Sequence, residues 1–107
     1  MARLQPYSIG YVAAVAEHLQ VIEQKYHSLI RAKIQEQLSF EPGVETINRK
    51  RLRQPAAFGA EWEIRFGPGN RFRVLYTFSD AMREVCVLAI GVKDRNRLFI
   101  GDEEIML

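Results

Sequence analysis

Two stretches of alternating side chains, separated by a turn, constrain this chain more than any other feature. Apolar residues occupy the even positions from 58 to 66 and again from 72 to 78. The residues between them, Gly67-Pro68-Gly69-Asn70, are of the types that favour tight turns. Alternation on both sides of such a turn predicts a β-hairpin over residues 58–78, with one apolar face.

The register of this hairpin follows from burial. Both apolar rows must lie on one face, and with the turn placed at 68–70 this puts Phe66 opposite Phe72. The same register puts Arg65 opposite Arg73 on the other face, with Glu63 one step along. Two guanidinium groups that face each other repel. The pair therefore predicts a neutralising carboxylate, a bound anion or a well-hydrated surface at this place.

The residues before the hairpin predict a short strand followed by helices. Residues 6–12 are expected to form the strand. Positions 13–38 contain no glycine or proline, and their apolar residues recur at the helical period. One helix of this length would span about 39 Å, too long for so small a domain. We expect two helices folded against each other, with a break at 26–28 and Ser28 as the cap of the second.

The remaining segments complete an α+β fold class. Residues 44–57 are expected to form a basic loop. Residues 84–92 are apolar at both parities, as in a strand covered on both faces, and Cys86 within them is expected to pack in the core. The prediction is a single domain over 1–107: a short amino-terminal strand, a two-helix hairpin, then a three-stranded antiparallel meander in one sheet, with the helices on one face.

Positive charge is concentrated in one part of the chain. The net charge is +2, but residues 49–97 contain eleven Lys or Arg against five Asp or Glu, and the remainder is acidic. This asymmetry suggests a polyanionic partner, although charges of this kind also serve to keep a surface hydrated. Basic clusters at 49–53 and 93–97 flank the hairpin arginines, and guanidinium groups suit phosphate.

Several kinds of site are not indicated by the sequence. It has no Walker loop, glycine-rich nucleotide fingerprint, CxxC pair or HExxH motif, so we expect no cofactor and no metal. His18 and His27 are expected at the surface or its boundary rather than as metal ligands. The first residues do not show the charged-then-apolar pattern of a signal peptide, and no apolar run approaches the ~18 residues of a membrane span. We expect a cytoplasmic protein without a membrane partner.

Several segments, taken together in their order, resemble one protein family. They are Leu38-Ser-Phe-Glu-Pro42, Asn48-Arg-Lys-Arg-Leu-Arg53, Trp62-Glu-Ile-Arg65, Arg73-Val-Leu-Tyr76 and Val87-Leu-Ala-Ile-Gly-Val-Lys93-Asp-Arg-Asn-Arg97-Leu-Phe-Ile-Gly101. In spelling and order they are similar to the RelE/ParE superfamily of type II toxin–antitoxin toxins, over nearly the whole chain. The resemblance implies a strand, two helices and a strand meander. It also implies an acidic antitoxin as partner, with promoter DNA bound only through the antitoxin complex.

The two branches of that superfamily imply different activities. RelE-like toxins cleave mRNA on the ribosome, using Lys and Arg groups that orient the RNA and stabilise the transition state, usually with a tyrosine. ParE-like toxins inhibit DNA gyrase and have no nuclease site. By the resemblance, Arg73 falls on the key strand arginine, Arg65 on a nearby one and Lys93 on a second catalytic arginine.

The match departs from RelE at three positions. Phe99 stands where RelE has the catalytic tyrosine, and Glu61 and Glu63 stand where it has two lysines. If the chain is an endoribonuclease, we expect Glu63 to act as base on the 2′-OH while Arg65, Arg73 and Lys93 stabilise the phosphate. Further RNA contacts are expected from the other basic residues: Lys50, Arg51, Arg53, Arg71, Arg95 and Arg97.

These expectations favour a toxin that inhibits translation by ribosome-dependent mRNA cleavage. A gyrase inhibitor without nuclease activity is the alternative, favoured by the reversed charges at 61 and 63. A non-toxic binding relative is the third. The sequence does not identify the antitoxin, the codon preference or the oligomeric state.

Overall fold

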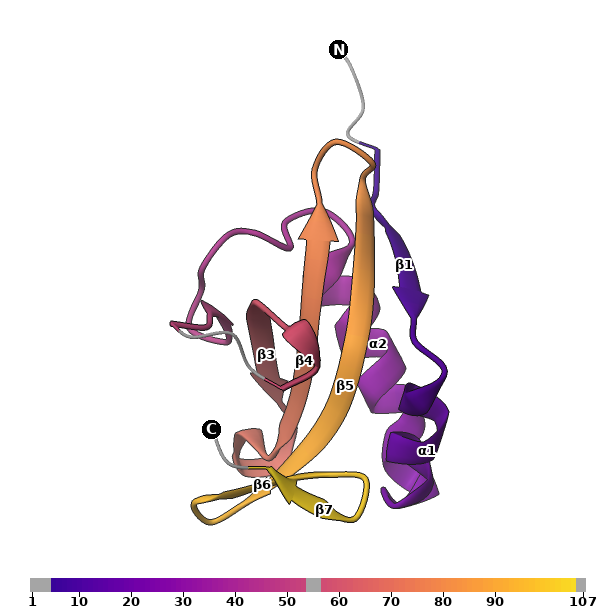
Figure 1. Cartoon of the computed structure of the whole chain (residues 1–107), viewed down its shortest axis with the longest axis vertical. Helices are drawn as coiled ribbons and strands as arrows, with labels where there is room; N and C mark the ends of the chain where they lie inside the picture. Colours follow the sequence, from indigo (N-terminus) through magenta and orange to yellow (C-terminus); the bar gives the residue numbers. More distant parts are fainter. Residues whose placement is uncertain (1–4, 54–56, 106–107) are drawn as a thin grey trace.

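The structure is a computed structural model that describes residues 5–53 and 57–105. Seven strands and two α-helices make up its regular elements (Figure 1). In chain order they are β1 (Ser8–Tyr11), α1 (Ala14–Gln20), α2 (His27–Leu38), β2 (Arg49–Arg51), β3 (Trp62–Phe66), β4 (Phe72–Ser79), β5 (Glu84–Asp94), β6 (Arg97–Ile100) and β7 (Glu103–Ile105). Three short 3₁₀ turns, η1 (Gln24–Tyr26), η2 (Ala57–Gly59) and η3 (Pro68–Asn70), join some of them.

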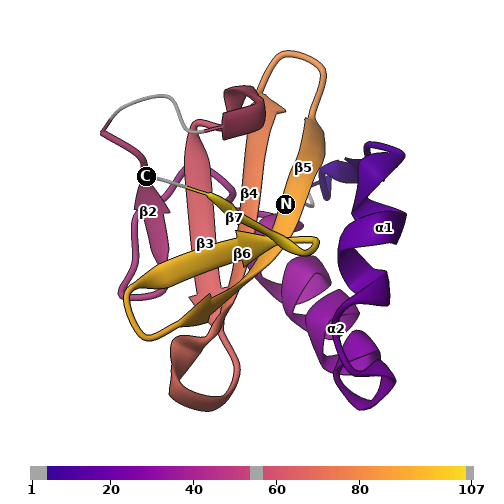
Figure 2. The same ribbon diagram turned by 60° about the horizontal axis from the view of Figure 1, so that its bottom comes forward.

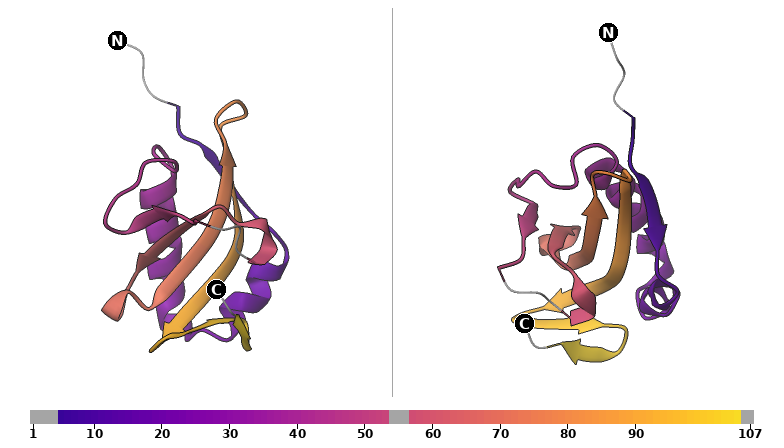
Figure 3. Two further views of the ribbon diagram at one scale, coloured as in Figure 1. Left: turned by 60° about the vertical axis from the view of Figure 1, so that its left-hand side comes forward. Right: turned by 45° about the horizontal axis from the view of Figure 1, so that its top comes forward.

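The strands form one sheet in the order β2-β3-β4-β5-β6-β7. The longest strand, β5, pairs with β4 along one edge and with both β1 and β6 along the other. The first half of β5 pairs in parallel with β1, from Ser8–Glu84 to Tyr11–Val87. Its second half pairs with the antiparallel β6, from Gly91–Ile100 onward. In both views of Figure 3, β1 runs beside β5. The α+β class is therefore confirmed, but the expected three-stranded meander is too small.

Two of the strands that the sequence prediction did not include, β2 and β7, are short and charged. Residues 49–51, expected in a loop, form β2 and pair with β3. Residues 103–105 form β7 and pair with β6. Both lie at the ends of the sheet order, where one edge is free and charged side chains are tolerated. Alternation of apolar residues cannot reveal such strands.

The hairpin register is confirmed. Ile64 lies opposite Val74, Phe66 opposite Phe72 and Arg65 opposite Arg73. The first strand is shorter than expected, because residues 57–59 form η2 rather than extended chain. Phe58 in this turn has a φ of +69° and is half exposed. The first strand of the hairpin therefore begins at Trp62 rather than at Phe58.

The apolar row of the hairpin packs against the helices. Figure 1 shows α2 behind β4 and β5. Ile30, Ile34 and Leu38 of α2 are almost fully buried against the sheet. The buried residues of this main core are Val15, Ile22, Ile30, Ile34, Leu38, Trp62, Ile64, Phe66, Phe72, Val74, Tyr76, Val85, Val87 and Ile90.

The two helices are arranged differently from the expectation. The break falls earlier in the chain, since α1 ends at Gln20 and α2 begins at His27. Ser28 is therefore inside α2 and does not cap it. His27 instead secures the connection, because its Nε2 donates to the Ile22 carbonyl at 2.8 Å. The helices do not close on each other, because an open groove lies between them.

A β-bulge explains why β5 is apolar at both parities. Leu75 pairs with Ala89, whereas the next residue, Tyr76, pairs with Val87, so Leu88 is extra. Side chains at 85 and 87 face the main core before the bulge, and Ile90 faces it afterwards. Cys86 consequently points to the opposite side and is half-buried, so its expected place in the core is wrong.

A second, smaller core covers the side of the sheet away from the helices. It consists of Ala60, Leu75, Ala89, Leu98 and Ile100. Figure 2 shows β6 and β7 lying across β3 and β4 on this side. The carboxyl-terminal strands therefore fold over the sheet and partly cover it.

His18 fills a gap in the sheet, contrary to the expectation of a surface position. The edge of β5 has no strand partner between the end of β1 and the start of β6. There the His18 Nδ1 accepts a hydrogen bond from the Ile90 N–H at 3.3 Å, and the side chain is buried. Burial lowers the pKa of His18, which Glu17 partly opposes.

Candidate functional site

The face-to-face arginines of β3 and β4 form an ionic cluster with Glu63, which we call the arginine cluster (Glu63, Arg65 and Arg73). The Glu63 Oε1 accepts from the Arg65 Nη2 at 3.0 Å and from the Arg73 Nη1 at 3.3 Å. The Glu63 side chain is 4% exposed and that of Arg73 is 9% exposed, whereas Arg65 is 37% exposed. One carboxylate thus serves two guanidinium groups, and the cluster keeps one positive charge in excess.

Local backbone structure holds Arg73 in place. Its Nε donates to the carbonyl of Asn70 at 3.1 Å. Asn70 closes the turn with a φ of +53°, a conformation that asparagine tolerates better than most residues. Burial lowers the pKa of Arg73, Glu63 raises it and Arg65 lowers it again. An arginine in this setting stays charged, so the cluster is a permanently cationic feature.

The strand β6 passes close beside Arg73. Gly91 of β5 lies opposite Arg73, and a Cβ at Gly91 would lie 2.8 Å from the Phe99 carbonyl oxygen. The side chains of Leu98 and Ile100 lie near the same point. The absence of a side chain at Gly91 therefore lets β6 lie close to the sheet at the residue opposite Arg73.

Two lysines extend the cationic surface on the same side of the sheet, which we call the arginine face. Lys50 of β2 pairs directly with Glu63, so its exposed side chain shares that face. Lys93 lies two residues after Gly91 and also projects to it, and its N–H donates to the Arg71 carbonyl at 2.6 Å. Each of the two basic segments that flank the hairpin, 49–53 and 93–97, thus contributes one lysine to the arginine face.

Other predicted contacts lie elsewhere. The guanidinium of Arg71 lies over the rings of Tyr26 and Phe72, 5.4 and 5.2 Å from their centroids, on the helix side. Arg51 pairs with the core residue Trp62 and so projects to the helix side as well. Arg53 follows β2 and is exposed.

The turn between β5 and β6 carries the remaining predicted arginines. Arg95 is exposed at its tip with a φ of +58°, and the Nε of Arg97 lies 3.6 Å from a Glu104 carboxylate oxygen. Arg49, which was not predicted as a site residue, is buried, and it donates to the Val44 carbonyl and the Gln37 side chain. Its role is to fix the loop before β2.

The geometry argues against Glu63 as a general base. A base must reach the proton that it takes, and this carboxylate is 4% exposed, with its Oε1 already bonded to both guanidinium groups. Its contacts instead orient both arginines. Glu61 lies further from them, exposed, and accepts a hydrogen bond from Thr77 Oγ1 at 2.6 Å. Chemistry at this face therefore rests on fixed positive charge.

The part of the chain that the structure describes offers no group of three or more His, Cys, Asp or Glu side chains able to hold a metal. Within the same residues, no helix has the length and apolar character needed to cross a bilayer.

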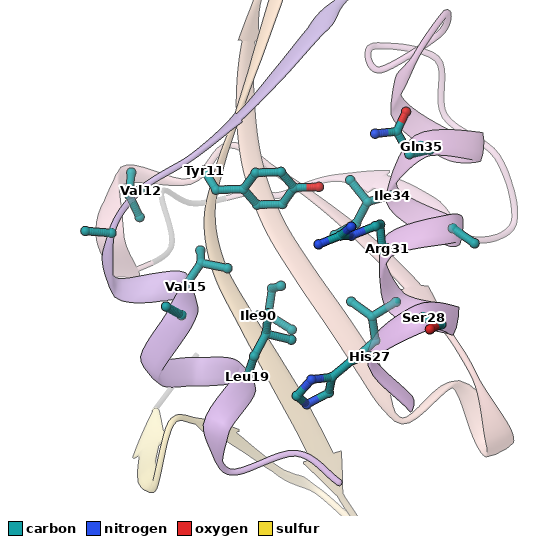
Figure 4. A pocket seen from close by; sticks show the side chains of 14 residues that line it. Tyr11, Val12, Val15, Leu19, His27, Ser28, Arg31, Ile34, Gln35 and Ile90 are labelled. Carbon is teal, nitrogen blue, oxygen red and sulfur yellow. The ribbon is translucent and has the colours of Figure 1, made fainter. Parts of the chain in front are cut away.

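A second concave feature lies on the helix side, between α1 and α2 (Figure 4). This groove has a volume of about 940 Å³ and is lined mainly by apolar side chains. No sequence signal indicated it, because the same residues fit the period of two helices packed together.

Comparisons of the chain with protein-family models, with curated proteins and with solved structures gave no match. The residues and their geometry therefore carry the functional argument.

Proposed function

We propose that the protein is the toxin of a type II toxin–antitoxin pair and inhibits translation by cleaving mRNA on the ribosome. The observation that carries the proposal is the arginine cluster, in which one buried carboxylate orients two arginines and leaves a net positive charge. The resemblance of the surrounding segments to the RelE/ParE superfamily supports it. Clustered guanidinium groups with fixed orientation are suited to phosphate and to the charge that develops on it during transfer.

In this mechanism the arginine face binds and polarises one phosphate of the RNA. Arg65, the most exposed member of the cluster, makes the direct contact, and Lys50 and Lys93 neutralise neighbouring phosphates. The 2′ oxygen gives its proton to solvent and attacks the adjacent phosphorus, and the bond from phosphorus to the 5′ oxygen breaks. The 5′ oxygen takes a proton from solvent, which leaves a 2′,3′-cyclic phosphate and a 5′ hydroxyl. Arg73 adds positive charge behind Arg65, and Glu63 keeps both guanidinium groups in position.

Expression in growing cells with mapping of transcript ends tests this proposal. We expect growth arrest with new mRNA ends, and loss of both on Arg65→Ala. Arg51→Ala is the matched control, because Arg51 projects to the helix side. Growth arrest without new transcript ends would contradict mRNA cleavage. Retained toxicity in Arg73→Ala would also count against a toxin that acts through this face, whereas its loss would count against a non-toxic relative.

Inhibition of DNA gyrase without nuclease activity is the second candidate. The specific observation that favours it is the burial of Glu63 and Arg73. Arg65 is then the one member of the cluster that is exposed enough to contact a phosphate directly, whereas cleavage would use several such groups. A supercoiling assay with purified gyrase distinguishes the two candidates. An unaffected gyrase excludes this one.

The cationic face also suits an acidic antitoxin as partner. The neighbouring reading frame is the simplest place to look for it. A short acidic protein with a DNA-binding end, able to restore growth when expressed with this chain, would support the toxin–antitoxin pairing and leave the target to the two assays above.

A further inference from the structure

The tight turn that leads into β2 lies beside the arginine cluster. Thr46 and Arg49 exchange two backbone hydrogen bonds, at 2.8 and 3.3 Å. Ile47 and Asn48 form the tip of the turn between them. The carbonyl of Asn48 accepts a hydrogen bond from the Arg65 N–H at 2.9 Å. Because β2 lies along β3 (Figure 2), the tip of this turn is fixed next to the most exposed arginine of the cluster.

The register of β2 and β3 places Asn48 on the arginine face. Lys50 lies opposite Glu63 on that face. The residue two positions before Lys50 is Asn48, and the same register sets it opposite Arg65. Opposite residues of an antiparallel pair have Cβ atoms about 5 Å apart. The side chains of Asn48 and Arg65 can therefore contact one ligand together.

The side-chain amide of Asn48 is not needed to build the turn. The side-chain bond within the turn comes from Thr46, whose Oγ1 accepts from the Asn48 N–H at 3.2 Å. The φ of Asn48 is not positive, so the backbone there does not call for asparagine. Within the described residues the amide takes part in no hydrogen bond, and the residue is partly exposed. It offers a donor and an acceptor side by side to a ligand.

Ile47 adds an apolar surface at the same tip. Its side chain is 85% exposed, the highest fraction among the large apolar side chains of the described residues. Arg65 and Lys50 beside the turn favour an anionic ligand, and Ile47 favours one that also has an apolar face. A nucleotide of single-stranded RNA combines a phosphate, a base edge with donors and acceptors, and an apolar base face.

We propose that Asn48 and Ile47 bind a nucleobase next to the phosphate held by Arg65, with the Asn48 amide on the edge of the base and Ile47 against its face. The inference rests on the proposed function, because it takes RNA as the ligand of the arginine face. Phosphate contacts alone carry no sequence information, whereas contacts to base edges do. The turn is therefore the part of the chain that makes binding depend on the base.

Two RNA probes that cannot be cleaved test the proposal on the full chain. One is a trinucleotide of 2′-O-methyl adenosine, in which the attacking oxygen is blocked, and the other is the same sugar–phosphate chain without bases. We expect the probe with bases to bind more tightly and to shift the NMR signals of the Asn48 side-chain amide. Asn48→Ala should weaken this probe about fivefold, as for one lost hydrogen-bonding contact, and leave the affinity of the probe without bases unchanged.

Further variants separate the base contact from the phosphate contact. Ile47→Ala should also weaken the probe with bases alone, whereas Lys50→Gln should weaken both probes equally. Met82→Ala changes an exposed apolar residue in the turn between β4 and β5, so it is the matched control for Ile47→Ala and should change neither affinity.

The outcomes distinguish the base contact from the proposed function. Equal binding of the two probes, or an equal effect of Asn48→Ala on both, would overturn the base contact and leave phosphate binding by the arginine face intact. Failure of both probes to bind would overturn RNA binding by that face, and the base contact with it.

Discussion

At the scale of single residues, Glu63 supplies the negative charge that lets Arg65 and Arg73 lie opposite each other in the sheet. Glu63→Gln leaves Arg73 buried and opposite Arg65 without a counter-charge. Breaking a buried ion pair in this way costs about 3 kcal/mol, so we expect the free energy of unfolding in urea to fall by that amount. Glu61→Gln is the control in the next position on the same face, is exposed, and should change stability by about 0.5 kcal/mol or less. Equal effects of the two substitutions would contradict the role given to Glu63.

His18 predicts a pH dependence of stability. Its pKa in the folded chain lies below the ordinary value of 6.5, so the unfolded chain binds the proton more readily. The stabilising contribution is complete above pH 6.5 and is lost as pH falls from there through the lower folded pKa. Thermal unfolding between pH 8 and 5 should show Tm decreasing below pH 6.5. His18→Gln should flatten this part of the curve, and a curve of unchanged shape would contradict the assignment.

At the scale of elements, the contact between β5 and β6 depends on Gly91. A methyl group there would lie 2.8 Å from the Phe99 carbonyl oxygen, so Gly91→Ala must push β6 away. Such overpacking costs about 2 kcal/mol. We expect a lower free energy of unfolding and faster hydrogen exchange in β6. Gly10→Ala in β1 is the matched control, because its new Cβ would meet nothing nearer than 3.9 Å. Equal exchange in β6 of both variants would contradict the close packing.

The elements also show what sequence could and could not predict. The hairpin register, including Arg65 opposite Arg73, was predictable because alternation and a turn together leave one register that buries both rows. The strand β2 was not predictable in this way, because its residues are all basic. The bulge at Leu88 has no sequence signal beyond apolar residues at both odd and even positions. The place of His18 has none either, because it lies beside the stretch of β5 that neither β1 nor β6 pairs with. The exposed fraction of Arg73 depends on tertiary packing, which the alternation of side chains does not show. The members of the arginine cluster were therefore predictable, and their exposure was not.

At the scale of the whole molecule, positive charge is divided between the two sides of the sheet. If RNA binds the arginine face, Lys50→Gln removes one phosphate contact and should reduce the slope of log K against log salt by about 0.7 for single strands. Arg31→Gln removes the same charge from the opposite side and should leave the slope unchanged. Titrations of a single-stranded RNA at several salt concentrations measure both slopes. Equal reductions would indicate binding by overall charge rather than by one face.

The pairing of β5 also sets an order of events when the chain is made. β1 precedes β5 by more than seventy residues, whereas β6 follows it directly. Ser8 can therefore pair with its partner Glu84 only after β5 has been synthesised. The hairpin of β3 and β4 closes through near neighbours, whereas β1 joins through distant ones, and distant pairing is slow. During synthesis the amino-terminal strand and its groove-lining residues therefore stay unassembled until β5 has left the ribosome. The groove on the helix side and the pairing around β5 therefore form together, once β5 and β6 have been synthesised.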